Sequence, residues 1–134
     1  MCLYSKQILP RRATKDITVY KVVCKVTDFL YSTPFKGFLI HESHFGKVIT
    51  DNKPKYIIKR AIFKGLHVII VESGYFHACQ TPENAYNFYL KNLMFRALIL
   101  KCTIPKGALY WKGILGDICS DKIIFNGVHY KLPL

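Results

Sequence analysis

Alternating hydrophobic and polar positions recur along most of the chain and predict a protein built mainly of β-strands. In residues 17–26, Ile17, Val19 and Val23 share one face of an extended segment, and β-branched residues occur on both faces, so we expect a central strand. Other strand-like runs span residues 56–63, 66–71, 95–104 and 108–111. The first two of these are joined by Lys64-Gly65, so we expect them to form an antiparallel hairpin.

The dipeptide Asn126-Gly127 separates two further hydrophobic runs, residues 122–125 and 128–132. Both of its residues tolerate the positive φ angles that a two-residue hairpin turn requires. We therefore predict a second hairpin here. The run at 128–132 is expected to be an edge strand, which either pairs with a second copy of the chain to form a homo-oligomer or is covered by the N-terminal arm.

One segment has helical periodicity. Thr81 can cap a helix N-terminus with its hydroxyl, Pro82 suits the first helical position, and Glu83 complements the positive end of the helix dipole. Apolar residues then recur at helical spacing, which predicts a helix over residues 82–94. A weaker helical turn is expected around residues 27–32. Together the elements predict the α+β class, with mostly antiparallel sheet and one main helix packed on it.

Length and charge add an expectation about partners. The 134 residues are expected to form a single domain, 1–134, with residues 1–16 as an irregular N-terminal arm. Lys and Arg number 20 against 8 Asp and Glu, a net charge of +12, and residues 1–67 carry +9 of it. Such a surplus attracts nucleotides, nucleic acid, acidic proteins or anionic lipid head groups. A merely solubilising surface is the alternative.

The chain has no apolar stretch long enough for a transmembrane helix, and its first residues do not resemble a secretory signal. We therefore expect a cytoplasmic protein that does not enter membranes. The cysteines are at least 17 positions apart, which favours free, mostly buried thiols over a zinc site. They are Cys2, Cys24, Cys79, Cys102 and Cys119.

Candidate catalytic groups are few. There is no phosphate-binding glycine loop, no H-E-x-x-H motif and no carboxylate cluster for Mg²⁺. Asp117 and Asp121 fit turn positions. His77 and Cys79 alternate on an extended segment, without a third group to activate the thiol. We expect a protein without catalytic residues, cofactor or metal.

The strand-to-helix junction over residues 74–88 is the most informative segment for binding. Backbone N–H groups and a partial positive charge at the start of a helix form a place where phosphate or carboxylate can bind. Tyr75 and His77 lie beside it and offer stacking and hydrogen bonds. An ordinary junction, with Phe76 and Ala78 in the core, is the alternative.

Several blocks of the chain carry a resemblance. They are Val19-Tyr20-Lys21-Val22 and residues 74–88, 101–108 and 119–125, together with the opening residues 1–7 and the turn Ile104-Pro105-Lys106-Gly107. Their arrangement resembles that of an uncharacterised family of small proteins from gut bacteria and their phages. The resemblance covers most of the chain and implies no known activity.

The order of these blocks is also similar to the ADP-ribosyltransferase layout, in which an arginine, a Ser-Thr-Ser strand and a glutamate hold and cleave NAD. Matched block by block, Lys21 takes the place of the arginine, residues 77–79 that of the Ser-Thr-Ser strand, and Lys122 that of the glutamate. This resemblance implies a split sheet whose cleft binds a nucleotide but lacks the carboxylate that catalysis needs.

We therefore expect a non-catalytic binding protein, of phage origin as the resemblance implies, that sequesters a small anionic nucleotide-type ligand and so counters a host defence signal. The expected ligand-binding residues are Lys21, Tyr75, His77, Thr81, Tyr110, Trp111 and Lys122. The alternatives are a nonspecific nucleic-acid-binding protein, whose affinity grows with strand length, and an inhibitor or virion protein that binds an acidic protein partner.

Overall fold

The structure is a computed structural model that describes residues 2–7, 9–33, 39–50, 55–60, 67–73, 76–92 and 94–132. Most of these residues lie in strands, and α1 (Pro82–Asn92) is the α-helix among them, which confirms the α+β class. The strands are β1 (Cys2–Ser5), β2 (Arg11–Arg12), β3 (Ile17–Thr27), β4 (Leu30–Ser32), β5 (Leu39–His41), β6 (Val48–Thr50), β7 (Lys55–Arg60), β8 (His67–Ser73), β9 (Phe76–Cys79), β10 (Ala97–Ile104), β11 (Leu109–Lys112), β12 (Asp117–Ser120) and β13 (Lys122–Lys131). A 3₁₀ turn, η1, spans Glu42–His44.

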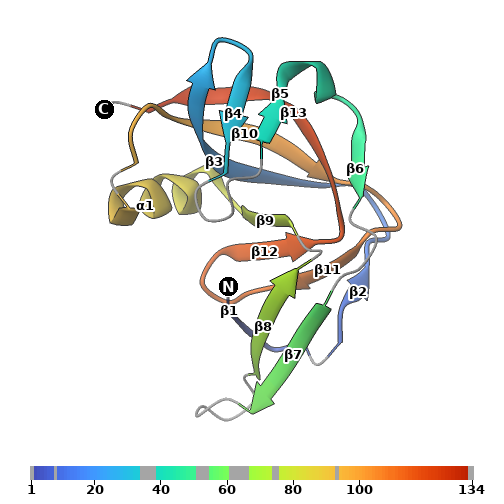
Figure 1. The fold of residues 1–134 in the computed structure, drawn as a ribbon. Coiled ribbons are helices and arrows are strands. Elements are labelled where there is room, and N and C mark those ends of the chain that lie inside the picture. The colour runs from blue at the N-terminus through green and yellow to red at the C-terminus, as the bar shows by residue number, and fades with distance from the viewer. Residues whose placement is uncertain are drawn as a thin grey trace.

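The described strands form two sheets. The larger has ten strands, eight of them in the order β2-β11-β12-β9-β3-β10-β13-β6; β4 pairs with β3, and β5 pairs with β4. The smaller has the order β1-β8-β7. The pairing of β7 with β8 is antiparallel, as predicted, and β3 is central. In Figure 1 the smaller sheet lies beside β11 and β12, whereas α1 lies beside β3.

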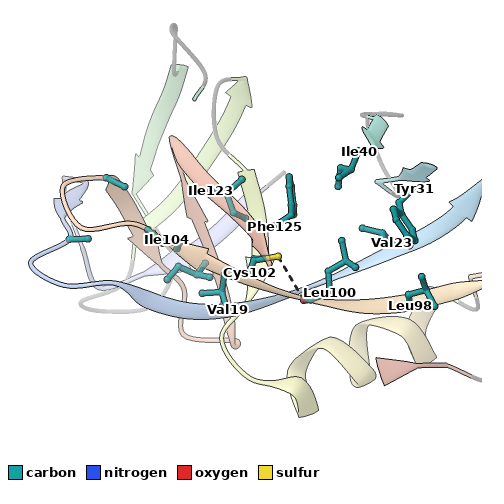
Figure 2. Packing of buried hydrophobic residues seen from close by; sticks show 14 residues of the cluster. Val19, Val23, Tyr31, Ile40, Leu98, Leu100, Cys102, Ile104, Ile123 and Phe125 are labelled. Atoms are coloured by element: carbon teal, nitrogen blue, oxygen red, sulfur yellow. Dashed lines mark hydrogen bonds between the residues drawn. The ribbon is translucent and has the colours of Figure 1, made fainter. Parts of the chain in front are cut away.

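The two faces of β3 and β10 build two hydrophobic cores. Val19 and Val23 pack with Leu100 and Phe125 in the main core, which gathers on the side of the sheet away from α1 (Figure 2). Val22 alternates to the other face and packs in a second cluster beneath α1. The period-2 pattern of the sequence predicts this division, because successive side chains of a strand point to opposite faces.

The helix is held by the predicted cap. Thr81 Oγ1 accepts a hydrogen bond from the backbone N–H of Asn84 at 3.1 Å and donates one to Asn84 Oδ1 at 2.7 Å. Ala85 and Tyr89 are buried against the sheet, which confirms the predicted apolar stripe. No helix in the described ranges combines the length and apolar character that a membrane crossing requires.

The predicted hairpin at Asn126-Gly127 is wrong. β13 runs through both flanking segments without reversing and pairs antiparallel with β10. Two one-residue shifts in the pairing leave Asn126 and His129 as the extra residues of β-bulges, and Gly127 has a φ of 154°. Asn126 Oδ1 also accepts a hydrogen bond from Thr103 Oγ1 at 2.8 Å. Because β10 pairs on both sides of the dipeptide, bulges replace the chain reversal that the local signal favoured.

Two other expectations are also corrected. Residues 27–32 form no helical turn: β3 turns back into β4 at Asp28 and Phe29, so β pairing takes the whole segment. The N-terminal arm is not irregular throughout, because β1 pairs with β8 and β2 pairs with β11. The strand expected from residue 95 begins two residues later, since Phe95 and Arg96 form a turn in which Arg96 has a φ of 53°.

Thr81→Ala is expected to lower the free energy of unfolding by about 1 kcal/mol, because the N–H of Asn84 loses its capping acceptor. Urea denaturation followed by circular dichroism measures the change. Thr81→Ser, which keeps the hydroxyl, is the matched control and is expected to stay within about 0.5 kcal/mol of the unmodified protein. Equal losses in both variants would contradict the capping role.

Candidate functional site

A groove with a volume of about 760 Å³ lies where the N-terminal arm, the β11–β12 turn and the start of α1 meet. We call it the basic groove. Its lining residues are Lys6, Gln7, Arg11, Gln80, Asn84, Lys112, Gly113, Ile114, Leu115 and Gly116. Its volume falls within the range of small-molecule sites.

One wall is the N-terminal arm, which Gln7 fastens to β11. Gln7 is buried, and its Oε1 accepts a hydrogen bond from the N–H of Lys112 at 2.7 Å. Its Nε2 donates to the carbonyl of Tyr110 at 3.2 Å. Ser5 Oγ donates to the carbonyl of Lys112 at 2.7 Å. The amide of Gln7 thus bonds with β11 as a strand backbone would, and it places Lys6 at the groove.

The opposite wall is the β11–β12 turn, which Gln80 fastens to the start of α1. Gln80 Nε2 donates to the carbonyls of Gly113 and Asp117, both at 2.8 Å, and its N–H donates to the carbonyl of Gly116 at 2.8 Å. Gly116 has a φ of 88°, and a Cβ there would overlap the amide of Asn84. Only glycine combines this backbone conformation with such a close approach.

The charge of the groove is entirely positive. Lys6, Arg11 and Lys112 are exposed, and none of the ten lining residues is acidic. Within the part of the chain that the structure describes, none of the three cations forms an ion pair; the pair found there joins Lys25 to Asp28 at 3.6 Å. The groove also lies beside the N-terminus of α1, whose dipole favours an anion. Its walls therefore suit a negatively charged ligand.

Lys21, expected to bind a ligand, contacts the protein itself. It lies on the main-core side of β3, and its ammonium donates a hydrogen bond to the backbone carbonyl of His77. β3 and β9 pair only through Tyr20 and Cys79, so the two strands separate beside this carbonyl. We call this place the strand fork. The side chain keeps intermediate exposure, yet burial around its ammonium lowers the pKa of Lys21, while the thiols of Cys102 and Cys79 act in the opposite direction.

The other expected residues are spread over the fold. Trp111 is fully buried, and Tyr110 packs against the main core. Lys122 is half-buried in β13, and its N–H donates to Ser120 Oγ at 3.3 Å. Thr81 caps α1 next to the groove, while Tyr75 lies outside the described residues. The structure brings Lys21 and His77 together, and none of the six expected residues that the structure describes lines the basic groove, so the role of the seven in binding stays a prediction.

Asp121 and the described cysteines do not form a reactive site. Asp121 Oδ1 accepts a hydrogen bond from the N–H of Leu109 at 2.9 Å. Cys24, Cys79, Cys102 and Cys119 are free thiols, and burial raises the pKa of Cys79 to about 11 and that of Cys102 to about 12. Neutral, buried thiols are unreactive. Among the described residues, no group of three or more His, Cys, Asp or Glu side chains could hold a metal ion.

Sequence reasoning missed the residues that line the groove. Two signals pointed toward it: the capped start of a helix, and the surplus charge of the N-terminal half, to which Lys6 and Arg11 belong. Nothing local shows that Gln7 joins Lys112, because the two are 105 positions apart.

Lys21→Met is expected to lower the free energy of unfolding by about 1–3 kcal/mol, because the carbonyl of His77 loses its donor. Burial lowers the pKa of Lys21 below its ordinary 10.5, so the unfolded chain keeps this proton to higher pH than the folded one. The contribution of Lys21 therefore grows as pH rises from the folded pKa to the unfolded one, and the variant loses more at about pH 9.5 than at pH 7.

Urea denaturation at both pH values measures this difference. Lys25→Met is the control, because it removes a lysine of the same strand whose ion-pair partner, Asp28, is largely exposed. A Lys21→Met protein as stable as the unmodified one at both pH values would show that the ammonium does not hold the fork.

Gly116→Ala is expected to destabilise the fold more than Gly46→Ala, by about 1–3 kcal/mol. Both glycines have similar positive φ angles, 88° and 81°, but a Cβ at Gly46 meets no atom within 4 Å, whereas one at Gly116 overlaps Asn84. The difference between the two variants in thermal unfolding isolates the contact with the start of α1. Equal effects would mean that only the φ angle matters.

Comparisons of the chain with protein-family models, with curated proteins and with solved structures found no match. The resemblances to the small-protein family and to the ADP-ribosyltransferase layout therefore stay predictions.

Proposed function

We propose that the protein binds a small anionic ligand of the nucleotide class in the basic groove and does not transform it. The observation that carries this proposal is the lining of the groove, which presents three cationic side chains and no carboxylate. Unpaired cations facing one hollow repel one another, and an anion relieves that repulsion. The ligand thus supplies the negative charge that the walls lack.

The groove offers different chemistry to the two ends of such a ligand. Arg11 can hold a phosphate with two parallel hydrogen bonds, and Lys6 and Lys112 add charge beside it. Ile114 and Leu115 expose 47% and 69% of their surfaces in the same lining. They suit the apolar face of a sugar or base, so van der Waals contact takes the place of the aromatic stacking expected from the sequence.

Binding without turnover suits a protein that sequesters its ligand. None of the lining residues is a carboxylic acid, histidine or cysteine, the groups that most often serve as general acids, bases or nucleophiles. Sequestration in the cytoplasm, as a phage protein acting on a host signal would require, is part of the proposal.

A thermal-shift panel tests the proposal, with mononucleotides, cyclic di- and trinucleotides, NAD and ADP-ribose set against single-stranded oligonucleotides of increasing length. A ligand at about 100 times its dissociation constant adds roughly 2.7 kcal/mol of stability. Stabilisation by one small nucleotide at physiological salt is the expected result. Stabilisation only by long strands, and lost with salt, would make the protein a nucleic-acid binder, and no effect at all would favour a protein partner.

Lys6→Gln combined with Lys112→Gln is expected to weaken binding of the best nucleotide about tenfold, because two exposed charges each contribute up to about 1 kcal/mol. Lys47→Gln combined with Lys91→Gln is the control, since both lysines are exposed and lie outside the lining. Isothermal titration calorimetry measures both affinities. An equal loss in the two double variants would show that net charge, rather than the groove, holds the ligand.

A further inference from the structure

A carboxyl group lies behind the positively charged wall of the basic groove. Asp117 begins β12, directly after the turn that lines the groove. A Cβ built on Gly113 would overlap Asp117 Oδ1, so this oxygen packs against the backbone of a lining residue. The absence of a side chain at Gly113 leaves room for the carboxyl group directly behind the groove.

The hydrogen bonding of Asp117 differs from that of two other carboxylates in the chain. Asp16 Oδ1 accepts from the N–H of Lys106 and Asp121 Oδ1 from that of Leu109, both at 2.9 Å. Asp117 Oδ1 is buried and has no hydrogen-bond partner among the described residues. A buried, unpaired carboxylate oxygen is costly, and protonation of the group removes its charge.

The surroundings of Asp117 favour its neutral form. Burial raises its pKa above the ordinary 3.8, and a hydrogen bond from its own backbone N–H acts against this. The thiol of Cys79 faces it from β9 in register and that of Cys119 lies on β12. The groove cations Lys6, Arg11 and Lys112 line the same hollow as Gly113, and Glu83 lies in the first turn of α1; none of these four is among the causes of the raised pKa of Asp117.

We propose that an anion bound in the basic groove draws one proton from solvent onto Asp117, so that the protein holds its ligand more tightly as the pH falls. This inference rests on the proposed function. A second negative charge on the other side of Gly113 disfavours the carboxylate, and proton uptake and anion binding must then strengthen each other by the same factor. The groove thus becomes a proton-linked anion site.

Inorganic sulfate is a suitable probe, because its charge does not change between about pH 5 and pH 7.5. Unlike a nucleotide, it also has no nucleobase that titrates. Its affinity is read from the backbone amide signals of Gly113 and Gly116 by NMR. In the unmodified protein, sulfate is expected to bind about tenfold more tightly at the lower pH; uptake of one proton allows at most tenfold per pH unit.

Asp117→Asn mimics the protonated group, so it is expected to bind sulfate at pH 7.5 more tightly than the unmodified protein does at that pH, with little dependence on pH. Asp121→Asn removes the same charge four residues away and is expected to keep the pH dependence. A variant-free measurement follows the ¹³C carboxyl signal of Asp117, whose midpoint is expected to rise when sulfate is added.

The outcomes separate the two proposals. The proton linkage is overturned if sulfate binds at Gly113 and Gly116 with the same affinity at both pH values. It is also overturned if Asp117→Asn retains the pH dependence of binding. In both cases the anion site remains supported. A carboxyl midpoint that sulfate does not move overturns the linkage as well. Absence of any amide shift at either pH overturns both the anion site and its linkage.

Discussion

The arrangement of the larger sheet depends on one contact, the ammonium of Lys21 against the carbonyl of His77. β3 and β9 share a single residue pair before they part, and a sheet that divides leaves backbone groups without a partner. Lys21 supplies the missing donor from the adjacent strand. Because of the strand fork, β9, β12 and β11 can diverge from β3 and contribute to the walls of the basic groove. β3 and β10 remain paired and pack against the main core.

Beyond the strand fork, two glutamine side chains make hydrogen bonds of the kind that a neighbouring strand would make. Gln7 bonds with the backbone of β11, and Gln80 joins both ends of the β11–β12 turn. Side-chain amides offer the same kinds of donor and acceptor as a peptide group. They therefore extend the hydrogen bonding of the sheet at places where none of the described strands supplies backbone partners. These hydrogen bonds hold the two walls that carry the cations of the basic groove. Exposed residues from distant segments therefore meet at one surface.

Features set by local chemistry could be predicted from the sequence, and features set by pairing between distant segments could not. The alternation of Val19, Val22 and Val23 and the cap at Thr81 act within a few residues, and both were found where expected. Asn126-Gly127 carried a strong local signal that pairing with β10 overrode. Lys21 was expected to bind a ligand because it takes the place of the arginine in the ADP-ribosyltransferase layout, and only the topology reveals the fork it occupies. The groove joins segments about a hundred positions apart, for which a single sequence holds no signal.

The bulges of β13 limit how far the larger sheet can grow. Beyond Ile124, where pairing with β6 ends, Asn126 and His129 each add a residue that puts the backbone out of step with β10. A regular strand approaching this outer edge would find its N–H and C=O groups aligned over a few residues at most, and Lys131 would end the match with a charge. Such interruptions are how sheets avoid joining edge to edge. The β-bulges that replace the predicted hairpin thus also disfavour edge-to-edge association along an edge that carries Tyr and Val side chains.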